Sequence, residues 1–129
     1  ENIMSENVRF YKCKICGNII GLINGNMEHI TCCGKPMELM KANSTDAAVE
    51  KHVPVYEKIE NEIVVKVGEV AHPMEKDHYI MWIAQVTDNK TTRVRFFPEQ
   101  NAETIFPYIP NSTIYAYCNK HGLWKTDVK

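Results

Sequence analysis

The stretch Tyr117-Cys118-Asn119-Lys120-His121-Gly122-Leu123-Trp124, near the C-terminus, contains a cysteine and a histidine separated by two residues. A thiolate and an imidazole at this spacing can bind one metal ion, and they are the side chains that hold zinc and iron most strongly. A single Cys-x-x-His pattern is a weak signal, because a buried cysteine beside a surface histidine gives the same pattern. The positions of the other cysteines and histidines decide between these two interpretations.

The composition restricts the class of protein. The 129 residues suffice for one ordinary core, or for a small module and a medium-sized one. The net charge of −1 argues against a nucleic-acid partner, and no apolar run is long enough to cross a bilayer. The first six residues are polar and acidic and lack the pattern of a signal peptide, so we expect a cytoplasmic protein. In that reducing compartment five cysteines indicate metal binding rather than disulfides, since an odd number cannot all pair within one chain.

Four of the cysteines lie in the first third of the chain, at Cys13, Cys16, Cys32 and Cys33. The Cys-x-x-Cys pair, followed by Gly17, lets two sulfur atoms point into one tetrahedral site while the glycine turns the backbone. Between the two pairs we expect a short strand over 19–23 and a hairpin turn at Asn24-Gly25-Asn26. A segment this small usually needs a bound metal to fold.

Three interpretations of these cysteines remain open, namely a structural zinc site, a redox dithiol and an iron site of the rubredoxin type. Four sulfur ligands do not by themselves separate zinc from iron. The adjacent Cys32 and Cys33 differ from the paired Cys-x-x-Cys of ordinary zinc ribbons, and we expect them to strain the tetrahedron.

The remainder of the chain has the pattern of a β-sheet domain. We place the domain boundary at the polar segment 41–46, which gives domains of 1–41 and 42–129. One helical turn is expected over 46–50, capped by Ser44 or Thr45. Beyond it, apolar or alternating runs are separated by turn residues, at 53–56, 63–67, 78–86, 92–97 and 113–117. This pattern predicts an all-β protein whose second domain is an antiparallel β-sandwich of the immunoglobulin type.

Four of the five histidines lie in this second domain, at His52, His72, His78 and His121. Each falls at a predicted strand end or in a loop, where a rigid sandwich can direct several side chains to one point. For any one of them an ordinary solvated or core histidine is the simpler interpretation. Four such positions beside a Cys-x-x-His favour a shared metal site, whereas His29 lies alone in the first module.

Together these motifs resemble the desulfoferrodoxin family, the two-domain superoxide reductases, over residues 11–125. The resemblance is carried by the cysteine pairs, by Glu50-Lys51-His52-Val53-Pro54, by His72-Pro73-Met74 with Tyr79-Ile80, and by the Cys118–Trp124 motif. It implies two iron ions per chain. A desulforedoxin-like Fe(Cys)4 centre would be held by Cys13, Cys16, Cys32 and Cys33. The second iron would be held by His52, His72, His78 and His121, with Cys118 as axial ligand and one position open.

The resemblance also implies the reaction, a one-electron reduction of superoxide to hydrogen peroxide at the second iron, which a rubredoxin-like donor then re-reduces. Lys51 and Glu50 match the loop residues beside the open position. Lys51 would attract the superoxide anion and order water for proton transfer, and Glu50 would be a swinging sixth ligand in the oxidised state. A homodimer is implied, without nucleic acid or membrane. Ala116 stands where some relatives have an acidic residue, so contacts near the Cys118 sulfur are expected to differ.

Two other classes of protein are weighed against this one. A non-catalytic zinc knuckle joined to a partner-binding sandwich would be colourless and would tolerate loss of His72 or His78. A metal-dependent hydrolase or dioxygenase on a cupin-like barrel would use two or three histidines with a carboxylate, and the axial cysteine argues against it.

Overall fold

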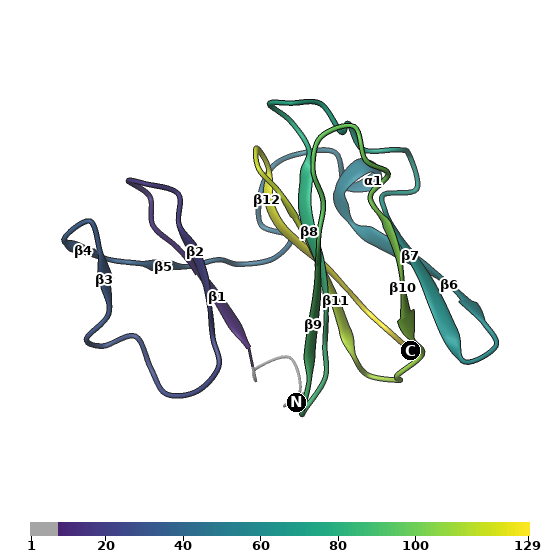
Figure 1. Cartoon of the computed structure of the whole chain (residues 1–129), viewed down its shortest axis with the longest axis horizontal. Helices are drawn as coiled ribbons and strands as arrows, with labels where there is room; N and C mark the ends of the chain where they lie inside the picture. The colour runs from purple at the N-terminus through teal and green to yellow at the C-terminus, as the bar shows by residue number, and fades with distance from the viewer. Residues whose placement is uncertain (1–7) are drawn as a thin grey trace.

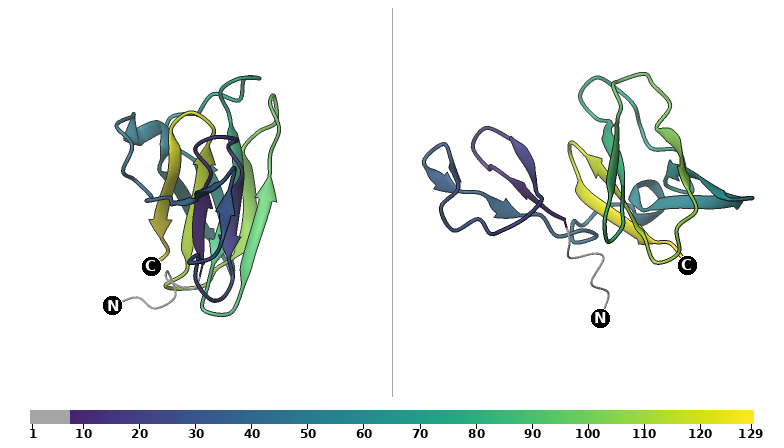
Figure 2. Two further views of the ribbon diagram at one scale, coloured as in Figure 1. Left: turned by 90° about the vertical axis from the view of Figure 1, so that its left-hand side faces the viewer. Right: turned by 60° about the horizontal axis from the view of Figure 1, so that its bottom comes forward.

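The computed structural model describes residues 8–129 and arranges them as a small β module beside a larger two-sheet unit (Figure 1). The second view in Figure 2 shows the two units side by side, with the linker passing between them. Within these residues no helix is long or apolar enough to span a membrane. The all-β class predicted from the sequence is confirmed, because α1, Val49–His52, is the one helix among the described residues and has a single turn.

The small module contains a three-stranded antiparallel sheet and a separate two-stranded ribbon. The sheet has the order β2-β1-β5, with β1 at Arg9–Lys12, β2 at Ile19–Leu22 and β5 at Glu38–Leu39. The ribbon pairs β3, Thr31–Cys32, with β4, Lys35–Pro36. Among the described residues of the module, the buried apolar side chains are few, namely Phe10, Cys13 and Met37. Such a core is too small to hold the module together unaided.

The hairpin turn predicted at Asn24-Gly25-Asn26 is wrong. β2 pairs with β1, which precedes it, and not with a strand that follows this turn. The hairpin loop is instead the Cys-x-x-Cys segment, closed by hydrogen bonds from Cys13 N to Asn18 O (2.9 Å) and from Gly17 N to Cys13 O (2.9 Å). Gly17 adopts a φ of +81°, the left-handed conformation that this loop needs.

The larger unit is a sandwich of two antiparallel sheets, as predicted. One sheet has the order β10-β7-β6, formed by Glu103–Pro107, Glu62–Val67 and Pro54–Ile59. The other has the order β12-β11-β8-β9, formed by Gly122–Asp127, Thr113–Cys118, Ile80–Val86 and Thr91–Arg95. Between the sheets lies an apolar core that includes Ile63, Val65, Ile83, Phe106 and Ile114. Side chains alternate along each strand, so one face of β11 enters this core and the other faces the module.

Helix α1 begins later than the sequence predicted. The N-cap is Ala48, which makes no side-chain cap hydrogen bond, and neither Ser44 nor Thr45 caps the turn. The Ser44 hydroxyl donates instead to Lys41 O at 2.7 Å, within the linker. Ser44 and Thr45 lie four and three residues before the N-cap, too early in the chain to accept from the first N–H groups of the helix.

The module contacts the sandwich through the outer face of β8 and β11. The Phe10 ring lies 5.0 Å from that of Trp82 and 5.2 Å from that of Tyr115. The Lys12 ammonium donates to the Tyr117 hydroxyl at 3.0 Å. In the linker, Asn43 is paired with β12, because its side chain donates to Lys125 O (3.2 Å) and accepts from Lys125 N (2.8 Å). The linker is therefore fixed along the strand that follows His121.

Candidate metal centres

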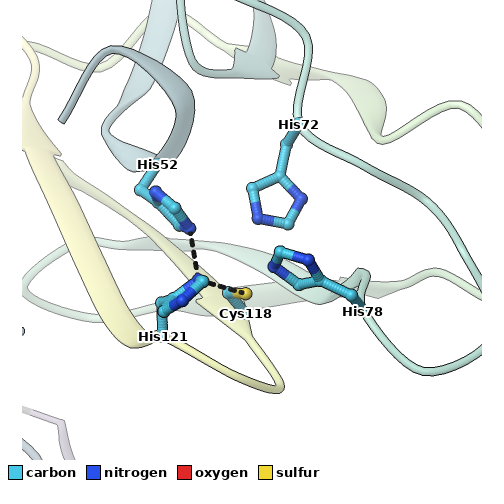
Figure 3. Close-up of side chains that lie close together, drawn as sticks. All are labelled: His52, His72, His78, Cys118 and His121. Carbon is cyan, nitrogen blue, oxygen red and sulfur yellow. Dashed lines mark hydrogen bonds between the residues drawn. The ribbon is translucent and has the colours of Figure 1, made fainter. Parts of the chain in front are cut away.

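Five potential metal ligands converge at one end of the sandwich. His52 is the last residue of α1, His72 lies in the loop after β7, and His78 lies just before β8. Cys118 ends β11, and His121 lies in the turn between β11 and β12. One donor atom from each of the five lies within 4.8 Å of the others, and Figure 3 shows the four rings directed at one another beside the sulfur.

The four imidazole rings form a closed square. Neighbouring ring centroids are 4.7 Å apart for His52 and His72, 4.9 Å for His72 and His78, 5.0 Å for His78 and His121, and 4.8 Å for His121 and His52. Adjacent rings are nearly perpendicular, with interplanar angles of 75–88°. Edge-on nitrogens at the four corners of a square are the donor arrangement for the equatorial plane of a metal ion.

Hydrogen bonds show which nitrogen each ring directs inward. His52 Nδ1 donates to Ala48 O at 2.7 Å, and His72 Nδ1 donates to Pro73 O at 2.7 Å. A carbonyl can only accept, so in each ring the proton is on Nδ1 and the lone pair on Nε2. The Nε2 atoms of His72 and His78 are buried and have no hydrogen-bond partner among the described residues. Buried polar atoms are normally satisfied, so these two fit a metal ion bound in the square.

The ring of His121 directs Nδ1, and not Nε2, into the square. His121 Nδ1 lies 3.0 Å from His52 Nε2 and 3.9 Å from the Cys118 sulfur. The inward donors are therefore three Nε2 atoms, one Nδ1 atom and one sulfur. Four nitrogens and a thiolate exceed the four ligands that zinc prefers and leave one position of an octahedral ion for another ligand.

Burial favours the neutral, metal-binding form of three histidines of the square, namely His52, His72 and His78. Desolvation lowers the pKa of His52 and His78, and it lowers the pKa of His72 to about 4. The pKa of the Cys118 thiol is raised, mainly by burial. At neutral pH metal binding should therefore release a proton from Cys118 and none from these three histidines.

These shifts predict that the metal-free protein loses stability as the pH falls from 7 to 5. The pKa of His72 falls from 6.5 in the unfolded chain to about 4 in the folded one, and those of His52 and His78 shift in the same direction. The unfolded chain therefore takes up protons first, so the free energy of unfolding decreases as the pH falls through this interval. Urea unfolding after metal removal should show the decrease, and His72→Gln should reduce its slope; a free energy that does not change with pH would contradict the assignment.

The four remaining cysteines form a second set of donors in the module, with their sulfur atoms within 4.8 Å of one another. The Cys16 and Cys32 sulfurs are 3.5 Å apart, and Asn18 Nδ2 donates to the Cys32 sulfur at 3.7 Å. Cys33 has a φ of +53°, unusual for a residue other than glycine, which accords with the strain expected from adjacent ligands.

The thiols of this four-cysteine set hold their protons very unequally. Hydrogen bonds, the largest from the backbone of Cys16, lower the pKa of Cys13 to about 6. The pKa of Cys33 is raised to about 12, chiefly by its hydrogen bond with Cys16. One thiolate thus forms readily and is shared by neighbouring thiols, and a cation is needed before all four can ionise.

Three residues considered from the sequence lie outside these two donor sets. Glu50 and Lys51 are exposed on α1, next to His52, and the Glu50 carboxylate is not one of the five donors. His29 is exposed in the module and belongs to neither set.

The chain was compared with known families and proteins. A family model described as desulfoferrodoxin matches residues 44–127, and one described as desulfoferrodoxin, N-terminal domain, matches residues 5–40. The chain belongs to the desulfoferrodoxin family. The desulfoferrodoxin of Syntrophotalea carbinolica is 46% identical over 125 residues, which cover 96% of this chain and 99% of that protein. The desulfoferrodoxin of Desulfarculus baarsii is 47% identical over 126 residues, with the same coverage.

Solved structures agree with this family. The superoxide reductase from Treponema pallidum superimposes with a TM-score of 0.72 at 27% identity, covering 93% of this chain and 97% of that one. A mutant of the superoxide reductase (neelaredoxin) from Archaeoglobus fulgidus, in the reduced form, gives a TM-score of 0.54 at 26% identity, covering 67% of this chain and 95% of that one. The resemblance inferred from the motifs is confirmed, and the two donor sets are consistent with the two iron sites of a desulfoferrodoxin. The cupin-like alternative is wrong, because the chain belongs to the desulfoferrodoxin family over both of its parts.

Sequence reasoning assigned no role to two residues that support the five-donor site. Asn119 anchors the turn between Cys118 and His121, since its side chain accepts from Tyr79 N (2.9 Å) and donates to Asp77 O (3.0 Å). Trp124 stacks on the ring of His52 and donates a hydrogen bond from Nε1 to His121 O. In the sequence, Asn119 lies between Cys118 and His121, and Trp124 follows three residues after His121. This closeness to the potential ligands was the sequence signal that could have indicated a supporting role.

Proposed function

We propose that this desulfoferrodoxin is a superoxide reductase, which reduces superoxide by one electron to hydrogen peroxide. The observation that carries the proposal is the square of four imidazoles with a sulfur beside it. His52, His72, His78, His121 and Cys118 would together hold an iron ion. Bound there, a ferrous ion supplies the electron and, with the thiolate donating electron density, an open position for a small oxygen species.

Lys51 is proposed to act at the open side of this site. Lys51 is exposed and directly precedes His52. Desolvation is the main cause of the lowered pKa of His52, and the charge of Lys51 adds a smaller contribution, which supports a positive charge close to the site. Superoxide is an anion, and a cation there should increase its rate of capture. The same ammonium can order the water that gives protons to the departing peroxide. Glu50, the preceding residue, is proposed as a carboxylate that swings over the open position between turnovers.

Lys51→Ala should slow the capture of superoxide severalfold at low ionic strength, since electrostatic steering contributes about 10-fold or more to such rates. The difference from the wild type should shrink at high salt, because an exposed charge is screened. Pulse-radiolysis measurement of the second-order rate as a function of salt is the direct test, and the visible spectrum of the iron should not change.

The matched control for Lys51 is Lys90→Ala. Lys90 is also exposed but lies in the turn after β8, at the opposite end of that strand from His78. Its removal changes the net charge equally and should leave capture unchanged. Equal rates for wild type and Lys51→Ala at low salt would rule out steering by Lys51.

We infer that the chain divides into domains of 1–41 and 42–129. The two family models support this boundary, since one ends at residue 40 and the other begins at residue 44. In the first domain Cys13, Cys16, Cys32 and Cys33 would hold the other iron of the chain, separate from the one at the five-donor site. The small core of the module supports a bracing role for that metal, because few apolar side chains are buried there.

A homodimer and a rubredoxin-like electron donor complete the proposal. Each turnover consumes one electron, so the proposed partner delivers electrons to the site one at a time. The dimer is supported by exposed apolar side chains of the module, Ile15, Ile23, Ile30 and Leu39, and by a groove of about 670 Å³ between the module and β8–β9. Sedimentation equilibrium should give twice the mass of one chain, and a single-chain mass would exclude the dimer.

The proposed activity can be tested with protein loaded anaerobically with ferrous iron. Superoxide consumption should require iron, so the metal-free and zinc-loaded proteins should be inactive, because zinc undergoes no redox change. Consumption by the zinc-loaded protein at the same rate would contradict the proposal.

A further inference from the structure

Trp124 contacts two residues of the imidazole square at once. It lies in the middle of β12 with 2% of its surface exposed, in register with Ala116 of β11. Its indole is stacked on the ring of His52, with a centroid distance of 5.0 Å and an interplanar angle of 26°. Its Nε1 donates a hydrogen bond to His121 O at 3.0 Å. One side chain therefore fixes the plane of one ring and the backbone that carries another.

The two histidines that Trp124 contacts have little local support for their relative position. They are 69 residues apart in sequence, and His52 is carried by a single helical turn whose N-cap makes no side-chain hydrogen bond. Their facing nitrogens nevertheless lie 3.0 Å apart. This edge of the square depends on tertiary contacts, because no turn or hairpin joins the segments that form it.

The opposite edge of the square is arranged locally. His72 and His78 belong to one loop, in which Glu75 N donates to His78 O (2.9 Å) and His78 N donates to Glu75 O (3.1 Å). The same turn folds the chain back before β8 begins at Ile80. This turn holds His78 from within its own loop, and the Asn119 side chain adds hydrogen bonds to Tyr79 N and Asp77 O on either side of it. No turn of this kind joins His52 to His121, so the His52–His121 edge is the one that needs a brace.

We propose that Trp124 is a positioning residue that holds His52 and His121 in register as a preformed half of the metal site. This inference rests on the proposed function in one respect, namely that the five donors bind a metal ion. The stack fixes the ring plane of His52, while the bond to Ala48 O fixes its rotation, so Nε2 points inward. The indole N–H fixes the carbonyl of His121 and with it the turn that presents Nδ1. Partners of this kind typically change metal affinity by about 10- to 100-fold when they are removed.

A competing explanation is that Trp124 only fills the core, and the substitution Trp124→Phe separates the two. Phenylalanine keeps an apolar ring against His52 and loses the N–H donor to His121. Trp124→Leu removes the aromatic stack as well. The chain contains two tryptophans, and Trp82 is a matched control. It is 7% exposed in the same sheet, and its indole is stacked on the Tyr117 ring at 5.7 Å and 13°, on the face away from the square.

The measurement is the rate at which a strong iron chelator removes each iron from the anaerobically loaded full chain. We expect Trp124→Phe to accelerate loss of the iron at the five-donor site about 10-fold. Loss of the iron held by the four-cysteine set should keep the wild-type rate, so that iron is an internal control. Trp82→Phe should match the wild type at the five-donor site. Thermal unfolding of the metal-free variants measures the ordinary packing cost of each substitution.

Two outcomes would overturn the proposal. One is an unchanged rate of iron loss in Trp124→Phe; the other is an equal acceleration in Trp82→Phe, which would mark a general effect of core packing. If Trp124→Leu does not fold, the phenylalanine variant still decides. Because iron retention is measured without superoxide, loss of the proposed activity and loss of this inference would be told apart.

Discussion

Replacing His72 with alanine should abolish the reduction of superoxide. His72 is 8% exposed, and its Nε2 is one of the two buried atoms of the square that no described residue satisfies. Without it three imidazoles remain, and an additional position on the metal opens to water. Loss of a direct ligand should cost more than the approximately 100-fold that marks the upper range for loss of a supporting partner. The measurements are the rate of superoxide consumption and the iron content of the purified variant.

The matched control for this prediction is His29→Ala, which removes the fifth histidine. His29 is exposed in the small module, outside both donor sets, so its loss should change neither iron content nor rate. His72→Gln tests the role of the nitrogen with a side chain closer in size. A His72→Ala variant that keeps both irons and the full rate would show that His72 is not a ligand.

Cys13→Ser should remove one of the two irons and leave peroxide production intact. Cys13 is 3% exposed and is the thiol whose pKa is lowered to about 6, so it is the member of the four-cysteine set that ionises first. Without its sulfur the set has three donors, and the module loses the metal that its small core requires. The five donors in the sandwich are held by α1, the β7–β8 loop and the β11–β12 turn, none of which belongs to the module.

The expected readouts for Cys13→Ser are one iron per chain, loss of the absorption of the iron in the four-cysteine set, and an unchanged yield of peroxide. Limited proteolysis should then cut within residues 8–41 before it cuts the sandwich, because the module is the part that unfolds. The module contacts β8 and β11 through Phe10 and Lys12, so these contacts are the route by which independence could fail. Loss of both irons together would show that the two parts do not fold independently.

The sequence predicted which side chains gather, because histidines at strand ends and loops are placed by a rigid sandwich. It did not predict which nitrogen each ring uses. That choice depends on the carbonyls of Ala48 and Pro73, whose positions follow from the backbone of α1 and of the His72 loop. For the same reason the Cys-x-x-Cys loop was not seen to be the β1–β2 hairpin, since its closing bonds are between backbone groups and leave no residue signature beyond Gly17.

The contribution of Trp124 was hidden for a different reason. A tryptophan three residues after a ligand histidine has the pattern of an ordinary core residue, and it is one. Only the fold shows that the ring stacked on His52 and the carbonyl of His121 are reached by the same indole. Pairing of β11 with β12 places Trp124 near the turn that carries His121, whereas His52 comes from α1, so the double contact joins residues 69 positions apart.

The most direct test of the account is the amount of hydrogen peroxide formed per superoxide consumed by the iron-loaded protein in the presence of a one-electron donor. A site that only gives electrons to superoxide should yield one peroxide for each superoxide consumed. A yield of one half would mean that superoxide is also oxidised, as in a dismutase, and would contradict the proposed reaction.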